Sequence, residues 1–382
     1  MIDRPVTILQ ILPKLDPGGA ERVAIEIAEA VHLAGARSLI VAEDGPISHL
    51  AKRAGAEVIT LPVATKNPLK IARNVKQLKK VLAAAQVSLV HAHSRAPAWS
   101  AYLAARQMGI PFITTYHGSY SEKTRLKRRY NRVMVSGERV VAVSEYVADL
   151  IKSRYDIDFN KITVIHNGVD PVKFDPESVR GDRAVRLAKD WRIENGQPTI
   201  LLPARLTAWK GQRLFIEALA KMRHQEAVGI LLGSDQGRHQ YTQELMDLAT
   251  QLGVGGRLRL AGHTEDMPAA FKFANIVANC STKPEAFSLM IIEAQAMAKI
   301  VVAADHGGTP ETIEQNISGF LVPPNDVEAL AKTFDMILES DTQMRLDFGA
   351  RTREAVLGRY SLATMQTCYL QLYAEILGWP AS

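Results

Sequence analysis

At 382 residues the chain is long for a single hydrophobic core and suits two domains. Hydrophobic residues make up 47% and charged residues 23% of the sequence, and these ordinary globular values exclude disordered and fibrous proteins. The two cysteines, Cys280 and Cys368, cannot form a disulfide framework, which fits a reducing compartment.

The N-terminal run MIDRPVTILQILP predicts a strand, because it lacks the basic start and long apolar core of a signal peptide and is too short to span a membrane. We therefore expect a cytoplasmic protein. Residues 1–175 hold 25 basic and 16 acidic side chains, whereas the remainder holds 21 basic and 24 acidic ones. No acidic residue lies between Glu57 and Glu122, so this part is a candidate for contact with an anionic partner.

Short β-branched runs without polar alternation are separated by helix-length amphipathic segments, such as 20–34, 69–85 and 97–108. This pattern predicts a parallel sheet covered on both faces. The strands expected in the first series are 6–12, 38–42, 58–61, 88–93, 112–117, 140–144 and 162–166.

The stretch NGVDPVKFDPES breaks this rhythm with a glycine and two prolines, and it is a candidate linker. We expect an N-terminal domain over 1–175, a C-terminal domain over 176–360, and a terminal helical segment over 361–382 that packs back on the N-terminal domain. The fold class is α/β, with two doubly wound, Rossmann-like domains facing each other. The strands expected in the second series are 199–204, 229–233, 258–261, 276–280, 300–304 and 320–322.

Ligands of doubly wound sheets bind at the carboxyl ends of the strands, so residues there are candidates for a site. Arg205 follows one expected strand, and Lys210 stands five residues later at a helix start. Arginine offers a planar fork to phosphate oxygens and lysine adds a point charge, although two solvated charges in a surface loop would look the same.

Two further strand ends carry candidate residues. Gly18 and Gly19 open the first expected helix, where backbone amides could approach an anion. The spacing is not a dinucleotide fingerprint, and an ordinary turn is the alternative. His117 ends another strand, where it could touch a substrate or simply cap the strand.

The stretch KPEAFSLMIIEAQAMA sets Glu285 and Glu293 eight positions apart around an apolar run. Burying Glu293 there costs free energy unless its carboxylate is hydrogen-bonded or neutralised. We expect a helix from about Ser288, so that the amides of Phe287, Ser288 and Leu289 face an anion. Glu293 could accept hydrogen bonds from the two hydroxyls of a ribose, or it could be a buried structural carboxylate.

The order and spacing of these motifs resemble the family 4 (group 1) retaining glycosyltransferases. The shared motifs are Gly-Gly near the N-terminus, Arg-x4-Lys after the linker, Glu-x7-Glu, NGVD, HGGTPETI and SGFLVPPND. The resemblance covers nearly the whole chain. It implies the GT-B fold, in which two facing Rossmann-like domains hold the nucleotide mainly through the C-terminal one and the N-terminal one lies on the acceptor side.

Carried over residue by residue, the resemblance implies that Arg205 and Lys210 hold the donor diphosphate and that Glu293 binds the ribose hydroxyls. It implies that Glu285 contacts hydroxyls of the donor sugar. Gly19, next to Gly18, should face the distal phosphate, and His117 looks like the family's histidine beside the transferred sugar.

This chain departs from the family at Ala286 and Ser288, where glycines are usual, and the departure narrows the space beside the sugar. The family also tends to have Gly and Pro where Ala298 and Ile300 stand, which should affect packing. These changes bear on the identity of the donor and not on the fold.

Basic side chains gather in two segments. They could form a solvated basic face, or they could bind an anionic membrane surface. Nucleic acid is disfavoured because aromatic residues are not interleaved with these charges. The residues are Lys66, Lys70, Arg73, Lys76 and Lys80 in the first segment, and Lys123, Arg125, Lys127, Arg128, Arg129 and Arg132 in the second.

Two other patterns could suggest a metal. Asp156 and Asp158 match the letters of a D-x-D motif, but two solvated acids in a loop explain them as well. His91 and His93 would point the same way from one strand without a nearby cysteine or acid, which favours strand-end packing.

We therefore expect a retaining glycosyltransferase that moves a sugar from a nucleotide-diphosphate donor to a hydroxyl of a glycan or lipid-linked acceptor. No metal or other cofactor is expected, because the cationic pair Arg205 and Lys210 can stabilise the leaving diphosphate. The basic face suggests lipopolysaccharide core or another envelope glycan as acceptor, and peripheral attachment to the inner face of the plasma membrane. The rivals are a nucleotide-sugar 2-epimerase, which needs no acceptor, and a non-catalytic sugar-binding protein, which would normally be exported.

Overall fold

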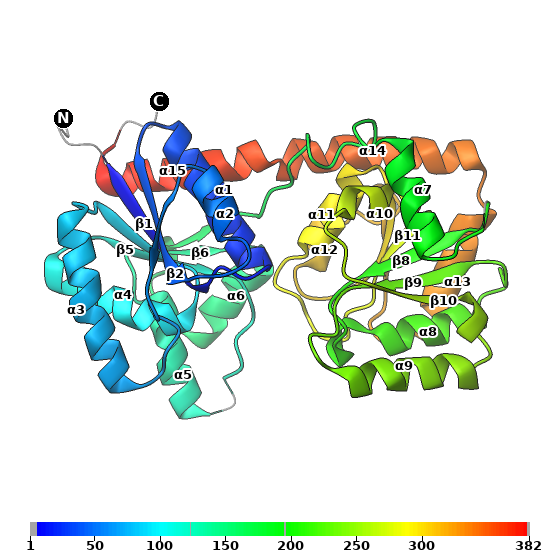
Figure 1. The fold of residues 1–382 in the computed structure, drawn as a ribbon, viewed down its shortest axis with the longest axis horizontal. Helices are drawn as coiled ribbons and strands as arrows, with labels where there is room; N and C mark the ends of the chain where they lie inside the picture. Colours follow the sequence, from blue (N-terminus) through cyan, green and yellow to red (C-terminus); the bar gives the residue numbers. More distant parts are fainter. Residues whose placement is uncertain (1–5, 123, 195, 380–382) are drawn as a thin grey trace. The chain divides into compact units, whose positions relative to one another are not determined.

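The computed structural model describes residues 6–122, 124–194 and 196–379 and divides into two compact units. The first unit runs to Asn167 and resumes at Leu362, and the second extends from Gly168 to Ser361. Figure 1 shows helices covering a central sheet in each unit. Within the described ranges, every helix is too short or too polar to cross a bilayer.

The first unit is built on a seven-stranded parallel sheet with the order β3-β2-β1-β4-β5-β6-β7. The strand order reverses between β1 and β4, so this unit has a topological switch point of the doubly wound type. Its strands are β1 (Thr7–Lys14), β2 (Arg37–Glu43), β3 (Glu57–Thr60), β4 (Leu89–Ala92), β5 (Phe112–Tyr116), β6 (Arg139–Ala142) and β7 (Ile162–Val164). Its helices are α1 (Gly19–Leu33), α2 (Ser48–Arg53), α3 (Pro68–Ala84), α4 (Arg95–Met108), α5 (Arg125–Asn131), α6 (Glu145–Arg154) and α15 (Leu362–Leu377), with short 3-10 turns η1 (Arg132–Val135) and η2 (Phe159–Lys161).

The second unit is built on a six-stranded parallel sheet with the order β10-β9-β8-β11-β12-β13, which reverses between β8 and β11. Its strands are β8 (Thr199–Pro203), β9 (Val228–Leu232), β10 (Leu258–Gly262), β11 (Ile276–Asn279), β12 (Ile300–Ala304) and β13 (Phe320–Val322). Its helices are α7 (Gly181–Asp190), α8 (Gln212–Lys221), α9 (His239–Gln251), α10 (Met267–Phe273), α11 (Leu289–Ala296), α12 (Thr309–Thr312), α13 (Val327–Glu339) and α14 (Thr342–Tyr360), with η3 (Ala208–Lys210) and η4 (Gly255–Arg257).

The strands lie in the ranges that the apolar runs predict, and the prediction of two doubly wound α/β units is confirmed. Packing explains why these runs lack polar alternation. In β8, Ile200 and Leu202 belong to one hydrophobic core, whereas Leu201 belongs to a second core on the other face of the sheet. Because successive side chains of a strand point to opposite faces, a sheet covered by helices on both sides needs apolar residues at every position.

The last helix, α15, completes the core of the first unit. Met365, Tyr369 and Tyr373 are buried in the same cluster as Val23 and Ile27 of α1. The steps of four residues between the three α15 side chains place them on one face of that helix. The end of the chain therefore packs on the unit that contains its beginning.

Two histidines are buried beneath α15 in this core. The rings of His91 and His93 lie with their centroids 4.1 Å apart, as alternate positions along a strand predict. His91 Nδ1 lies 2.7 Å from the Tyr373 hydroxyl, and its Nε2 lies 2.7 Å from the Thr115 hydroxyl. Burial lowers the pKa of both rings well below the usual range, because the charged form would be desolvated.

Buried neutral histidines make the first unit sensitive to acid. Unfolded histidines take up protons as the pH falls through about 6.5, whereas the buried rings of His91 and His93 stay neutral. The free energy of unfolding should therefore fall below that pH, by up to roughly 1.4 kcal/mol per pH unit for each ring. Hydrogen exchange of β4 and β5 peptides at pH 7.5 and 5.5, corrected for intrinsic exchange, measures this change within the unit.

The exposed His49 provides a matched substitution, His49→Gln, with which the two buried rings can be compared. Equal protection of β4 at the two pH values would contradict the prediction.

Candidate functional site

Lys210 and Glu285 meet at the carboxyl ends of two neighbouring strands of the second unit. Lys210 Nζ lies 2.8 Å from Glu285 Oε2, and 18% and 9% of the two side chains are exposed. Lys210 follows β8 and Glu285 follows β11, which flank the point where the strand order reverses. Two of the candidate residues, 75 positions apart in the sequence, thus form one ion pair where such sheets bind ligands.

A glycine brings the Lys210 turn against the end of β11. Gly211 has φ +75°, and a Cβ atom there would lie 1.7 Å from the carbonyl oxygen of Cys280, so only glycine fits. The amide of Thr282 donates a 2.8 Å hydrogen bond to the carbonyl of Trp209 and ties the same two loops together. The Nζ of Lys210 also lies 4.4 Å from the centroid of the Trp209 ring. Backbone contacts therefore fix the position of Lys210.

The carboxylate of Glu285 is held by polar residues that the sequence did not single out. Asn279 Nδ2 lies 3.2 Å from Glu285 Oε1, and the Ser281 hydroxyl donates to the same oxygen. His306 Nε2 donates a 2.7 Å hydrogen bond to the carbonyl of Ser281. The amide of Gly308, in the HGG motif, donates to the backbone carbonyl of Glu285 at 2.8 Å. Asn279 and Ser281 therefore hold the carboxylate in one orientation, and the backbone bonds hold the segment that carries it.

Arg205 is exposed in the loop that follows β8. Its backbone carbonyl accepts a 2.9 Å hydrogen bond from Nε2 of the buried Gln212, which anchors the main chain. No hydrogen bond or ion pair of its guanidinium occurs with the residues that the structure describes. The loop therefore presents one fixed lysine and one unpaired guanidinium.

Helix α11 begins at Leu289, with Ser288 as its N-cap, close to the expected start. Ser288 is buried, and its hydroxyl accepts a 3.2 Å hydrogen bond from Asn279. Phe287 packs edge-on against Tyr360, with ring centroids 5.7 Å apart. Glu293 is 7% exposed in the middle of the helix. Asn279 thus links Glu285 to the start of the helix that carries Glu293.

The remaining candidate residues lie in the first unit. Gly18 and Gly19 are exposed at the start of α1, with Gly18 as an extended N-cap. His117 directly follows β5, and its Nε2 lies 2.9 Å from Nδ1 of the buried His93. Burial lowers the pKa of His117 to about 4, so its ring is neutral at neutral pH. The structure therefore separates the candidates into a histidine and two glycines in one unit, and the cationic and acidic residues in the other.

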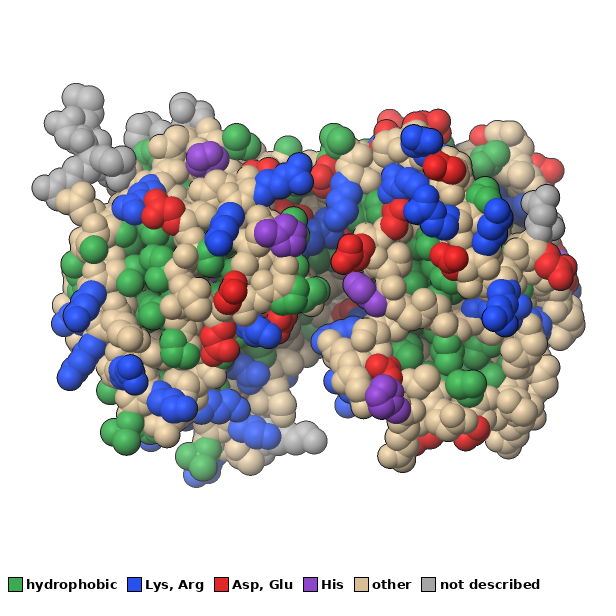
Figure 2. Space-filling view, in the orientation of Figure 1, with side chains coloured by type: hydrophobic (Ala, Val, Ile, Leu, Met, Phe, Trp, Pro, Cys, Tyr) green, Lys and Arg blue, Asp and Glu red, His purple; other side chains and the backbone are tan. Residues whose placement is uncertain are grey.

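The basic segments of the first unit form an exposed surface, which Figure 2 shows as blue side chains gathered low on that unit. Lys123 lies outside the described residues. The two segments meet, because Lys66 Nζ lies 5.7 Å from the centroid of the Tyr130 ring in α5. Leu69 and Leu126 are 82% and 80% exposed among these cations.

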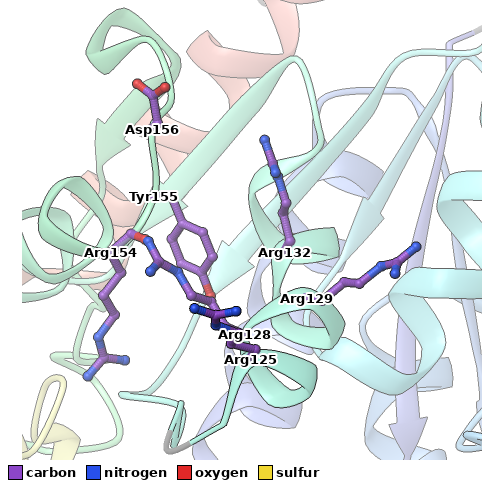
Figure 3. Close-up of a pocket in the computed structure, with 7 residues that line it drawn as sticks. All are labelled: Arg125, Arg128, Arg129, Arg132, Arg154, Tyr155 and Asp156. Carbon is purple, nitrogen blue, oxygen red and sulfur yellow. The ribbon is translucent and has the colours of Figure 1, made fainter.

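Part of this surface is a pocket of about 290 Å³ (Figure 3). Arg154 Nη1 donates a 2.8 Å hydrogen bond to the carbonyl of Tyr120, and Arg128 donates to the carbonyl of Arg154. In Figure 3 Arg129 projects away from the Tyr155 ring. The lining residues are Arg125, Arg128, Arg129, Arg132, Arg154, Tyr155 and Asp156.

The two aspartates that match a D-x-D motif, Asp156 and Asp158, have other roles in this structure. Asp156 lines the arginine pocket, and Asp158 accepts a 3.0 Å hydrogen bond from the amide of Asn160. Across residues 6–122, 124–194 and 196–379, no cluster of three or more histidine, cysteine, aspartate or glutamate side chains is suited to hold a metal ion.

Family models match both halves of the chain. Residues 17–173 match the model described as Glycosyltransferase Family 4, and residues 186–355 match the model described as Glycosyl transferases group 1.

Solved structures show the same fold. The crystal structure of a glycosyltransferase from Rickettsia africae ESF-5 has a TM-score of 0.91 and is 34% identical, with 98% of this chain and 99% of that chain covered. Anabaena HepE, solved in complex with UDP-glucose, has a TM-score of 0.84 and is 25% identical, with 97% and 99% covered.

Among curated proteins, the D-inositol 3-phosphate glycosyltransferase of Salinispora arenicola is 30% identical over 296 residues. The matched part is 70% of this chain but 65% of that relative, so the match spans slightly less than two thirds of the relative's length. With both family models matched and a glycosyltransferase of known structure 34% identical along nearly its whole length, the chain belongs to the family 4, group 1 glycosyltransferases and is a glycosyltransferase enzyme.

Proposed function

We propose that this enzyme transfers a sugar, with retention, from a nucleotide-diphosphate donor to an acceptor hydroxyl, and that Arg205 and Lys210 bind the diphosphate. The observation that carries the proposal is the ion pair between Lys210 and Glu285, which follow two adjacent strands. Lys210 shares its loop with Arg205, whose guanidinium has no partner among the described residues. Anabaena HepE in complex with UDP-glucose supports a nucleotide-sugar donor for this chain.

The proposed chemistry breaks the bond between the anomeric carbon and the diphosphate oxygen while the acceptor oxygen attacks from the same face. Negative charge grows on the leaving diphosphate, where Arg205 and Lys210 stabilise it, and the acceptor proton passes to a leaving phosphate oxygen. Glu285 already accepts hydrogen bonds from Asn279 and Ser281 and pairs with Lys210. A carboxylate engaged in this way suits a role in orienting sugar hydroxyls better than that of a free nucleophile.

The other residues complete the proposed donor site. Glu293 accepts hydrogen bonds from the ribose hydroxyls. At the start of α11, the amides of Phe287, Ser288 and Leu289 face the diphosphate. In the first unit, Gly18 and Gly19 approach the distal phosphate with their backbone amides, and His117 contacts the transferred sugar. These contacts need no metal ion, because cations and amides supply the positive charge.

We also propose that the basic surface of the first unit binds an anionic membrane, where the enzyme meets a lipid-linked or envelope-glycan acceptor such as lipopolysaccharide core. The support is a set of exposed cations interspersed with the exposed Leu69 and Leu126. Cations attract anionic headgroups, each contributing about 1 kcal/mol near the surface, and the leucines can enter the interface. The pocket that Arg128 and Arg154 help to line would seat a phosphate group.

Substitutions of the two acidic residues of the proposed donor site should have different effects on nucleotide affinity and turnover. Glu293→Gln should weaken binding of the donor and of the bare nucleoside diphosphate alike, because both carry the ribose. Glu285→Gln should leave nucleoside diphosphate affinity nearly unchanged and chiefly lower turnover, because the sugar loses its alignment. Calorimetry with the bare nucleotide, beside steady-state kinetics, measures both effects.

Glu314→Gln, an exposed change in the same unit, is the control and should alter neither quantity. The assignment is wrong if Glu285→Gln loses as much nucleotide affinity as Glu293→Gln.

The membrane proposal predicts salt-sensitive binding to vesicles that contain anionic lipid. Exposed charges are screened beyond about 8 Å at physiological ionic strength, so binding should weaken as salt rises. Changing Arg125, Arg128 and Arg129 together to glutamate should release the protein in a vesicle-sedimentation assay.

The matched control changes Arg186, Lys189 and Arg192, three exposed cations of the second unit, to glutamate. Equal release of both triple variants, or equal binding of the unaltered protein to neutral vesicles, would contradict a specific basic surface.

A further inference from the structure

A row of hydrogen bonds crosses the first sheet and ends at His117. Gln10 Nε2 donates to the carbonyl of Ala24 in α1 at 2.8 Å, and Gln10 Oε1 lies 2.8 Å from His93 Nε2. His93 Nδ1 lies 2.9 Å from His117 Nε2. Gln10 and His93 are at most 1% exposed. The row joins β1, the end of β4 and the end of β5, three adjacent strands.

The carbonyl of Ala24 determines which atom donates and which accepts in each hydrogen bond of this row. A carbonyl oxygen can only accept, so the Gln10 amide must present its NH₂ group to Ala24 and its oxygen to His93. The reverse orientation of the amide would place two bare oxygens 2.8 Å apart in the core and would leave a buried polar group without a hydrogen bond. The orientation of the glutamine is therefore fixed by chemistry.

The donor and acceptor roles of each ring follow from those of the group before it in the row. His93 Nε2 must carry a hydrogen, because it faces the amide oxygen of Gln10. A buried neutral imidazole holds one N–H, so His93 Nδ1 is a bare acceptor. His117 Nε2 must then donate to it, and the neutral ring leaves His117 Nδ1 without a hydrogen. No hydrogen bond to His117 Nδ1 occurs within the described part of the chain.

We propose that Gln10 and His93 are positioning residues that hold His117 as its Nε2–H tautomer, so that His117 Nδ1 accepts a hydrogen bond from a hydroxyl of the donor sugar. This inference rests on the proposed contact of His117 with the donor. A ring nitrogen without a hydrogen is an acceptor, so it attracts the hydrogen of a hydroxyl group. It repels a phosphate oxygen, because that oxygen is an acceptor as well. The row thus makes His117 selective for the sugar.

The tautomer can be measured directly on the whole protein labelled with ¹⁵N-histidine. Long-range ¹H–¹⁵N spectra should show His117 and His93 each with a protonated Nε2 and a bare Nδ1 at neutral pH. Finding a protonated Nδ1 on His117 in the unaltered protein would overturn the inference while leaving the proposed transferase chemistry intact.

Gln10→Leu should reverse both rings. Without the amide oxygen, an N–H at His93 Nε2 would be buried without an acceptor, which costs more than a bare nitrogen there. His93 should then carry its hydrogen on Nδ1 and donate to His117 Nε2, leaving His117 with a protonated Nδ1. Tyr373→Phe is the control, because it removes the hydroxyl beside His91 in the same core and should change neither signature.

Kinetics link the tautomer to function. Gln10→Leu should lower kcat/KM about tenfold, the size expected for one lost hydrogen bond. His117→Ala should have a similar effect, and the double variant should be no worse than His117→Ala, because Gln10 acts through that ring. Additive losses would overturn the positioning role. If His117→Ala turned over normally, the proposed sugar contact would fail although the tautomer result stood.

Discussion

The ion pair between Lys210 and Glu285 sets the proposed diphosphate-binding lysine beside the proposed sugar-binding carboxylate. It joins the loops after β8 and β11 where the strand order of the second sheet reverses, and Gly211 lets those loops approach closely enough for it to form. Both side chains are largely buried, so removing one partner should cost more than the roughly 1 kcal/mol of an exposed pair and less than the roughly 5 kcal/mol of a fully buried one. Because Asn279 and Ser281 also bond Glu285, the orientation of its carboxylate does not depend on Lys210 alone.

The two units use different chemistry at their strand ends. The second presents cations and carboxylates, whose charges suit a diphosphate and the hydroxyls around it. The first presents His117, whose burial keeps it neutral and whose partners Gln10 and His93 fix its hydrogen. The same neutrality makes the core beneath α15 sensitive to acid, since His91 and His93 resist protonation while folded. In the proposed function, His117 would recognise the sugar of the donor and the charged residues of the second unit would recognise its diphosphate.

Much of the fold follows from the sequence, because a strand buried on both faces must be apolar throughout, as Leu201 and its neighbours show. The start of α11 near Ser288 was likewise predictable from the proline and the apolar run. The pairing of Lys210 with Glu285 was not, since no local pattern brings together residues 75 positions apart. Asn279 and Gln10 were missed because one polar residue in an apolar strand carries no signal until the neighbouring strands are in register. The basic segments were visible as charge, but their meeting at Tyr130 depends on tertiary packing.

The central claim is that Arg205 and Lys210 bind the diphosphate of the donor. Calorimetry tests it most directly, with the nucleoside diphosphate that binds best among UDP, GDP and ADP and with the matching nucleoside, on Arg205→Ala beside Arg213→Ala, an exposed control on the next helix. Loss of a charge-assisted contact of about 1.5–3 kcal/mol should weaken binding of the diphosphate by roughly tenfold or more and leave binding of the nucleoside unchanged. Unchanged diphosphate affinity in Arg205→Ala, or an equal loss for the nucleoside, would contradict the account.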